Sequence, residues 1–249
     1  MTMALPVPPE DLRVTVGPFS DGGVFARSGD EMVSDIVALC GVATDASVLE
    51  VGCGCGRLAR AFANHIASGG RYDGFDLSRE AIAWCRQELQ PRLANFRFAF
   101  VDVQSPTFNP TGTITATALH FPYPDGAFDL AVVSSVFTHM LPDAIEHYVA
   151  ELARVVKRGG RCFITVFLFD RDAAAAVAKG DTIFDFRHPV GPCLAFDRAR
   201  PEEGVACRTD WFVALLARHG FGIDSLRTGN WRRVRAYEIS QDHVVARKP

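Results

Sequence analysis

Residues 48–60 read VLEVGCGCGRLAR, and this stretch decides the expected fold. An apolar run of strand type breaks at three glycines at every second position, Gly52, Gly54 and Gly56, and a helix-like pattern follows. Glycines let the backbone turn sharply and let a ligand lie against it without an intervening Cβ. The N-terminus of the next helix offers free N–H groups to a carboxylate or a phosphate. The stretch therefore predicts a ligand-binding loop between a strand and a helix.

Short apolar strands and helices alternate on both sides of this loop. We expect helices over residues 30–40, 57–65, 79–89, 143–156 and 210–219, and strands over residues 48–51, 71–75, 96–101, 129–133, 161–167, 222–226 and 234–245. Such alternation predicts an α/β fold with an open, mostly parallel sheet that is covered by helices on both faces.

Three segments stand apart from this alternation. Residues 1–28 are rich in proline and glycine and are expected to form an irregular arm before a single domain over 29–249. Segments 104–118 and 168–208 are longer than ordinary connections, and loops of this length are usually functional or disordered. The second segment is aromatic, which is not typical of a free linker, so we interpret it as a cap over a site, with a short helix near residues 172–177.

Composition and charge argue against several functions. The 249 residues are 48% hydrophobic and 22% charged, which is typical of a globular chain with a substantial core. The net charge of −3 disfavours nucleic-acid and membrane-surface partners, unless the arginines near 227–235 belong to a larger basic face. No apolar run approaches the about 18 residues that cross a bilayer, and the first residues do not resemble a secretory signal.

The seven cysteines are scattered and odd in number, which predicts reduced thiols in a cytoplasmic protein. Cys53 and Cys55 lack the spacing of a zinc site, so no metal is predicted. Their plain interpretation is that small, weakly polar side chains suit a crowded turn. A thiol at a helix N-terminus can also have a lowered pKa, which would make Cys55 sensitive to alkylation.

Acidic residues stand at the ends of three successive strands. Glu50 ends the first strand, Asp76 the second in GFDLS, and Asp102 the third in FVDV. In an open parallel sheet, ligands bind beyond the carboxyl ends of the strands, where the strand order reverses. Three carboxylates there suit a ligand with an ammonium, a ribose diol and an adenine, and they suit a pyrophosphate poorly. Each also has a plainer interpretation, since Asp102 could cap a turn and Asp76 could begin a helix.

The glycine spacing GxGxG also differs from the GxGxxG of dinucleotide-binding proteins, which disfavours a NAD-dependent dehydrogenase. Together these features resemble the class I S-adenosylmethionine-dependent methyltransferases. The resemblance covers roughly residues 46–168 and rests on VLEVGCGCGRLA, GFDLSREAI, FVDV, FPYPDGAFDLAVVSSVFTHM and ELARVVKRGGRCFITVF. The chain departs from the common pattern at Cys55, where a small hydroxyl residue is more usual, and in the length of the stretch after Asp102.

The resemblance implies a Rossmann-like, seven-stranded sheet whose last strand is antiparallel. It implies S-adenosyl-L-methionine as cofactor, S-adenosyl-L-homocysteine as product, and methyl transfer to an O or N atom of a small molecule, in specialised-metabolite biosynthesis for example. The residues that it implies for cofactor binding are Glu50, Gly52, Cys53, Gly54, Gly56, Arg57, Asp76, Leu77, Asp102, Val103 and Ser134.

The expected general base is His139, in SSVFTHML after the fourth strand, because imidazole removes protons near neutral pH. A structural role at the start of the next helix is its alternative. Further candidates for the acceptor pocket are His120, Phe137, His188 and Trp231, with Asn230 and Tyr237 nearby, although Trp231 also suits hairpin packing.

Two other functions remain open at this point. The cofactor fold could support non-methylating chemistry, such as cyclisation or elimination. It could also serve a non-enzymatic binding module, although the intact set of glycines and carboxylates argues against that. The acceptor and the oligomeric state are not fixed by the sequence.

Overall fold

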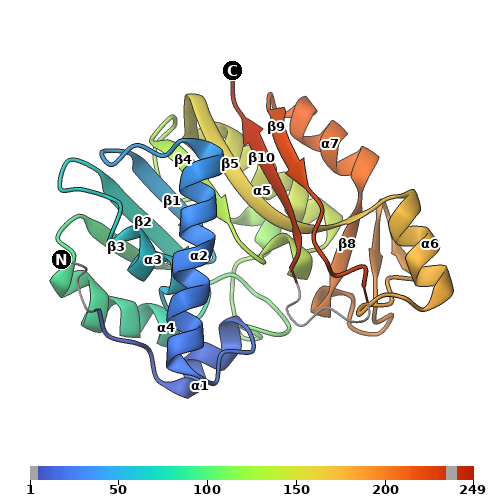
Figure 1. Cartoon of the computed structure of the whole chain (residues 1–249), viewed down its shortest axis with the longest axis horizontal. Helices are drawn as coiled ribbons and strands as arrows, with labels where there is room; N and C mark the ends of the chain where they lie inside the picture. The colour runs from blue at the N-terminus through green and yellow to red at the C-terminus, as the bar shows by residue number, and fades with distance from the viewer. Residues whose placement is uncertain (1–4, 234–239) are drawn as a thin grey trace.

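The computed structural model describes residues 5–233 and 240–249 and shows an open sheet with helices on both faces (Figure 1). The order of its main strands is β3-β2-β1-β4-β5, followed by β10 and β9. The first five run parallel, whereas β10 is antiparallel to both β5 and β9. The bounds are β1 (Ser47–Val51), β2 (Arg71–Asp76), β3 (Phe96–Phe100), β4 (Phe128–Val133), β5 (Val156–Phe169), β9 (Gly222–Arg227) and β10 (Asp242–Arg247). The mostly parallel sheet with an antiparallel last strand is thus confirmed.

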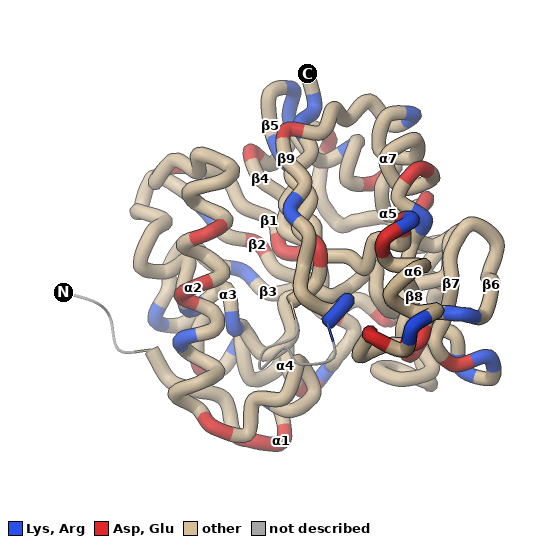
Figure 2. Tube along the Cα trace, turned by 45° about the vertical axis from the view of Figure 1, so that its right-hand side comes forward, with Lys and Arg blue, Asp and Glu red and all other residues tan. Residues whose placement is uncertain are grey.

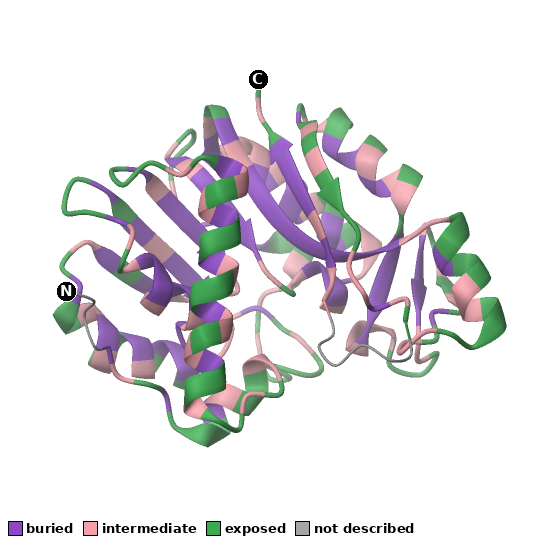
Figure 3. Ribbon diagram, viewed as in Figure 1, coloured by how far each residue is buried: buried purple, intermediate pink, exposed green. Residues whose placement is uncertain are grey.

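Two layers of helices cover this sheet (Figure 1). The helices are α1 (Glu10–Arg13), α2 (Gly22–Cys40), α3 (Arg57–Phe62), α4 (Arg79–Trp84), α5 (Pro142–Val155), α6 (Arg171–Lys179) and α7 (Thr209–Arg218). Apolar side chains of α5 and α7 pack on one face, and those of α2, α3 and α4 pack on the other. Figure 3 shows the strands buried between helices whose outer surfaces are exposed.

Strand β1 shows how the two faces are divided. Leu49 and Val51 belong to the core on the side of α5, and Val48 belongs to the core on the side of α2 and α3. Because side chains alternate along a strand, Glu50 points to the same side as Val48. A carboxyl group is therefore placed in the layer between the sheet and α3.

Several element bounds differ from the predicted ones. Helix α2 begins at Gly22 rather than at residue 30, because the Asp21 carboxylate accepts a hydrogen bond of 2.7 Å from the Val24 N–H and caps the helix. The predicted helix over 79–89 divides into α4 and a π-helical turn, Cys85–Leu89. Strand β5 begins at Val156, directly after α5, and not at residue 161. Of the predicted strand over 234–245, residues 234–239 lie outside the described part.

The segment 168–208 folds into structure of its own. It contains α6, β6 (His188–Val190), β7 (Cys193–Ala195) and β8 (Val205–Arg208). Strand β8 pairs parallel with residues 167–169 of β5, beyond the last residue of β5 that pairs with β4, and β7 and β6 follow antiparallel. An aromatic cluster around Phe167, Phe186 and Trp231 forms the core of this segment. Among the described residues, no helix is both long and apolar enough to cross a membrane.

Candidate cofactor and acceptor site

The loop after β1 is held in a conformation that favours glycine. Gly52, Gly54 and Gly56 have φ values of 74°, 50° and 80°, in the left-handed region. The N–H groups of Gly52 and Cys53 donate to the Phe75 carbonyl at 2.9 and 3.0 Å, which fixes the loop to the end of β2. A Cβ on Gly52 would lie 2.5 Å from the Val136 side chain, and one on Gly54 would lie 2.5 Å from Val16. The glycines therefore serve the turn and also a close approach from two other segments.

Asp76 ties this loop to the start of α4. One carboxylate oxygen accepts a hydrogen bond of 2.7 Å from the Gly54 N–H, and the other accepts one of 2.7 Å from the Ser78 N–H. The Ser78 hydroxyl in turn caps α4. Burial raises the pKa of Asp76, while the backbone N–H donors oppose that rise. Asp76 thus holds the glycine loop and the N-cap residue of α4 at once, because the two hydrogen bonds use different oxygens.

Glu50 is almost completely buried, with 3% of its surface exposed. The Tyr72 hydroxyl donates a hydrogen bond to its Oε2 atom. Burial raises the pKa of Glu50 to about 8, and the Tyr72 hydrogen bond and the charge of Arg57 oppose that rise. The Arg57 guanidinium lies 5.4 Å above the Phe19 ring, so the N-terminal segment reaches the start of α3.

Asp102 organises the segment 104–118. Its carboxylate accepts hydrogen bonds from the Thr113 hydroxyl at 2.7 Å and from the Asn109 amide at 3.2 Å. The same two hydrogen bonds lower the pKa of Asp102. Its backbone carbonyl accepts from the N–H groups of Thr113 and Ile114, both at 3.0 Å. The turn-capping interpretation of Asp102 therefore has direct structural support.

His139 lies where both inserted segments meet the end of β4. Its Nδ1 atom is 3.0 Å from the backbone carbonyl of Glu202, in the segment 168–208. The Phe108 ring, in the segment 104–118, packs edge-on against the imidazole at 5.2 Å. Burial lowers the pKa of His139, so the neutral form is favoured at neutral pH. A neutral imidazole that donates from Nδ1 to a carbonyl keeps Nε2 as a proton acceptor.

The residues between β4 and His139 form a hydrogen-bond network that the sequence analysis missed. Ser135 has a φ of 59°, and its N–H donates to the Thr165 hydroxyl at 2.8 Å. The Thr165 hydroxyl donates to the side-chain oxygen Oε1 of Gln241 at 2.6 Å. The side-chain nitrogen Nε2 of Gln241 donates to the Ser135 hydroxyl at 3.0 Å. The network joins the ends of β4 and β5 to the start of β10. Ser134 beside it is half-buried, with its hydroxyl 3.8 Å from the Met32 sulfur.

Two of the aromatic residues predicted for the acceptor pocket prove to be core residues. Phe137 is fully buried and packs against Phe212 of α7. Trp231 is fully buried against Phe167 and Phe186, and its indole N–H donates to Asp242 at 2.9 Å. Neither can line a pocket in this structure, because their surfaces are covered by neighbouring side chains.

The predicted histidines other than His139 lie away from the glycine loop. His120 is 72% exposed and pairs with Glu151 at 3.2 Å, near the C-terminal end of α5 and so at the opposite edge of the sheet. His188 lies on β6, the outermost strand of the small extension. Asn230 exchanges hydrogen bonds with Ser240, and Tyr237 lies outside the described residues.

The two cysteines of the loop have a packing function. Cys53 and Cys55 are both buried, and all seven cysteines of the chain are free. Cys55 packs in a small cluster with Leu12 and Phe25, and burial raises its pKa to about 12. The plain interpretation of the two cysteines as small packing side chains is supported over the alternative of an alkylation-sensitive Cys55, because a buried thiol with a raised pKa stays protonated. Leu77 and Val103 also pack into a core.

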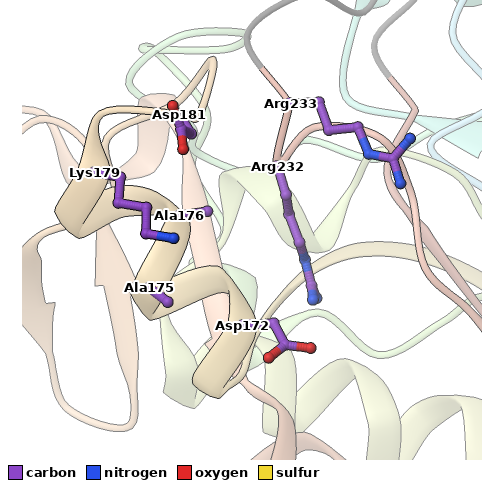
Figure 4. Close-up of a pocket in the computed structure, with 7 residues that line it drawn as sticks. All are labelled: Asp172, Ala175, Ala176, Lys179, Asp181, Arg232 and Arg233. Carbon is purple, nitrogen blue, oxygen red and sulfur yellow. The ribbon is translucent and has the colours of Figure 1, made fainter.

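Elsewhere in the described part of the chain, basic and acidic residues are mixed (Figure 2). Figure 2 shows Lys and Arg interspersed with Asp and Glu along the chain. Arg232 of the predicted basic cluster is engaged by the Asp170 carboxylate at 2.9 Å, and Arg235 lies outside the described residues. A hollow of about 480 Å³ lies between α6 and residues 232–233, as Figure 4 shows, and it is lined by both acidic and basic groups. None of the predicted site residues lines it.

Tyr72 was not among the predicted site residues, and the strand register explains why it reaches Glu50. Glu50 is opposite Gly74, which has no side chain, and Tyr72 stands two residues before Gly74 on the same face. A Cβ on Gly74 would lie 2.8 Å from Cys53 and 3.2 Å from the Tyr72 ring. Gly74 thus leaves space that the Tyr72 ring fills. No local sequence pattern pointed to Val16, Glu202 or Gln241 either.

The strand order reverses at β1, between β2 and β4, and a glycine loop with two acidic residues stands at that point. This arrangement defines an α/β protein that binds its ligand at the carboxyl ends of the strands. A cradle of glycines, a buried carboxylate and an acidic residue at the end of β2 fit a nucleoside cofactor with an ammonium group. A family model described as a methyltransferase domain matches residues 49–164. Over these residues the chain is similar to methyltransferase domains.

Two curated relatives are methyltransferases by name. Methyltransferase GfsG of Streptomyces halstedii is 29% identical over 159 residues, which are 63% of this chain and 51% of the relative. An arsenite methyltransferase of Aquipseudomonas alcaligenes is 25% identical over 174 residues, 70% of this chain and 43% of the relative. The chain thus spans about half the length of the curated relatives it matches.

Among solved structures, the [4+2]-cyclase SpnF superposes with a TM-score of 0.59 at 19% identity. The match covers 88% of this chain and 80% of that chain. At this identity the similarity shows the fold alone.

Proposed function

We propose that the protein binds S-adenosyl-L-methionine at the carboxyl ends of β1 and β2 and methylates an O or N atom of a small-molecule acceptor. The observation that carries the proposal is the glycine loop, which has left-handed conformations, is hydrogen-bonded to Asp76 and Phe75, and follows the buried Glu50 of β1. The acidic groups of this site suit a cationic ligand, and they suit the negatively charged pyrophosphate of a dinucleotide poorly.

Different residues would bind different parts of the cofactor. Glu50 lies at the end of β1 and would pair with the ammonium. Asp76 uses one lone pair of each oxygen for a backbone N–H, and each oxygen keeps further capacity to accept from a ribose hydroxyl. When bound, the cofactor supplies a methyl group on a positively charged sulfur, which is already activated for displacement.

His139 would remove the proton of the acceptor. Its Nδ1 hydrogen bond to Glu202 fixes the ring and leaves Nε2 to accept the proton. The lowered pKa keeps the imidazole neutral and able to act as a base. The segments 104–118 and 168–208 both contact His139 and would form the walls around a small acceptor.

The arsenite methyltransferase among the relatives raises arsenic as an acceptor, but the cysteines argue for oxygen or nitrogen. Arsenic is thiophilic, and a soft acceptor of this kind is held by accessible thiolates. Here the cysteines are buried, and within the described residues no group of three His, Cys, Asp or Glu side chains could hold a metal ion.

Calorimetric titration with S-adenosyl-L-homocysteine, with NAD as control ligand, tests the cofactor. We expect binding of the first ligand alone, and a loss of affinity of roughly a hundredfold in Asp76→Ala. The matched control is Asp73→Ala, three residues earlier on β2, whose carboxylate pairs with Arg71 at 3.4 Å. Wild-type affinity in Asp76→Ala, or tight binding of NAD, contradicts the proposal.

An acceptor screen tests the reaction itself. Purified protein is incubated with the cofactor and a panel of small alcohols, phenols and amines, and methylated products are detected by mass spectrometry. If S-adenosyl-L-homocysteine binds but no acceptor is methylated, the alternative of non-methylating chemistry in the same fold takes precedence. SpnF, which is named as a cyclase, shares the fold.

A further inference from the structure

The environment of Glu50 is unusual for a carboxylate that is expected to meet a cation. The side chain is 3% exposed, and within the described residues it forms no ion pair closer than 4.0 Å. Its one side-chain hydrogen bond there comes from the Tyr72 hydroxyl and is made to Oε2. An isolated buried carboxylate is costly, so a group in this position tends to keep its proton until a cation arrives.

The ring of Tyr72 is held rigidly. It stacks on Phe96 at 4.8 Å with an angle of 16° between the rings, and it contacts Phe62 at 6.0 Å. Tyr72 is itself fully buried, and the absence of a side chain at Gly74 leaves space for the ring. The hydroxyl therefore has a fixed position relative to Glu50, and donation to Oε2 leaves Oε1 for a proton or an ammonium.

The other charged and titratable groups around Glu50 come from four elements. Arg57 at the start of α3 favours the ionised form, and Asp76 at the end of β2 disfavours it. The thiols of Cys53 in the loop and of Cys85 in the π-helical turn stay protonated, because burial raises the pKa of each well above the usual value. Arg57 is half-buried and lies beyond ion-pair distance, so its charge does not replace a direct partner.

We propose that Tyr72 is a positioning residue for the cofactor, and that the ammonium of the bound cofactor takes the place of a proton on Glu50. This inference rests on the proposed function. In the empty protein, Glu50 is a neutral carboxylic acid that accepts from Tyr72. On binding, its O–H bond breaks, the electron pair stays on Oε1, and the proton passes to solvent. The carboxylate and the ammonium then form a buried ion pair. The net charge of this pair is zero, as was the charge of the neutral carboxylic acid.

Proton release provides a direct test. Binding of S-adenosyl-L-homocysteine is titrated at pH 7.0 in buffers of different ionisation enthalpy, and the slope of the observed enthalpy gives the protons released. Because burial raises the pKa of Glu50 to about 8, we expect close to one proton per cofactor. The isosteric variant Glu50→Gln should release none. Equal proton release in both proteins, or none in the wild type, overturns the inference.

The pH dependence of affinity gives a second readout. Between pH 6.0 and 7.5 the wild-type affinity should rise by about tenfold per pH unit, because one proton must leave for each cofactor bound. Glu50→Gln should bind weakly with no such slope. A flat wild-type profile contradicts the exchange.

Tyr72→Phe tests the positioning role while keeping the ring stacked on Phe96. Loss of the hydrogen bond should raise the pKa of Glu50 further and weaken binding at pH 7.0 by about ten- to a hundredfold. At pH 7.5 the variant should release more protons than the wild type, which a merely structural defect would not cause. Tyr123→Phe is the matched control, since Tyr123 packs edge-on against Phe128 at 5.0 Å on the other face of the sheet. Wild-type affinity and proton release in Tyr72→Phe would overturn the role of Tyr72.

The outcomes separate this inference from the proposed function. If S-adenosyl-L-homocysteine does not bind at any pH, the cofactor assignment itself fails. If it binds tightly without releasing a proton, the cofactor assignment stands and only the exchange at Glu50 is wrong. Thermal unfolding of each variant shows whether a lost affinity comes from a lost fold.

Discussion

The Nδ1 atom of His139 lies 3.0 Å from the backbone carbonyl of Glu202, although the two residues are 63 positions apart in the chain. This contact joins the turn after β4 to the 3-10 turn Pro201–Glu203 of the segment 168–208. It fixes both the orientation of the imidazole and, in the neutral form, the nitrogen that keeps its proton. This contact supports the proposal that His139 is the general base.

Replacement of this imidazole should affect turnover and spare cofactor binding. We expect His139→Ala to lower the rate of methyl transfer by ~10²–10⁴-fold, the usual contribution of a general base. The affinity for S-adenosyl-L-homocysteine should change little. Rate measurements with an acceptor from the screen, alongside calorimetry, check both expectations. His219→Ala, at the end of α7, is the control, and a decrease of only a few-fold in His139→Ala would return His139 to a structural role.

The pH dependence of turnover follows from the direction of the His139 pKa shift. Burial lowers this pKa below its usual value of 6.5, so the imidazole remains a neutral base down to a lower pH than a free histidine would. The rate at saturating cofactor should therefore stay constant as the pH falls to 6.5 and decline only below that value. A decline centred above pH 6.5 would exclude this histidine as the titrating base.

Asp102 and Thr113 provide a test of how the third carboxylate acts. If Asp102 works by holding the segment 104–118, then Asp102→Ala and Thr113→Val should have similar effects, because each removes the same 2.7 Å hydrogen bond. We expect both variants to speed proteolytic cleavage within 104–118 and to change cofactor affinity by less than about tenfold. A large loss of affinity confined to Asp102→Ala would instead support a direct contact with adenine.

Asp242 should be important for stability and not for chemistry. It is fully buried and accepts hydrogen bonds from the Leu168 N–H, the Gly229 N–H and the Trp231 indole, at 2.7, 2.7 and 2.9 Å. Asp242→Ala leaves these donors unsatisfied, so we expect a loss of about 3–5 kcal/mol in the free energy of unfolding. Chemical denaturation measures it. The exposed Asp45→Ala should change stability by less than about 0.5 kcal/mol.

Much of the site could be predicted from the sequence because it is local. The spacing of Gly52, Gly54 and Gly56 after an apolar run fixes a strand, a turn and a helix, and the turn places Glu50 beside the loop. The end of β2 at Asp76 follows from the same alternation, and parallel pairing brings it to the same edge. The mostly parallel sheet and its antiparallel last strand were likewise implied by the resemblance.

The partners of these residues could not be predicted, because they depend on packing between distant segments. Whether Phe137 and Trp231 face a pocket or the core depends on what covers them. Helix α7 covers Phe137, and the aromatic cluster covers Trp231. A reactive Cys55, the alternative to a packing function, would need solvent access, which Leu12 and Phe25 remove. The register of β1 and β2 decides that Tyr72 reaches Glu50.

The sequence by itself determined the α/β sheet, the glycine loop and the acidic residues at the strand ends, since these follow from short-range backbone preferences and hydrophobic periodicity. Only the tertiary structure decided which nitrogen of His139 is free, which oxygens of Asp102 are occupied and how deeply Glu50 is buried. The pKa and the hydrogen bonds of a side chain are set by its neighbours in space, and those neighbours come from segments that the local sequence does not specify.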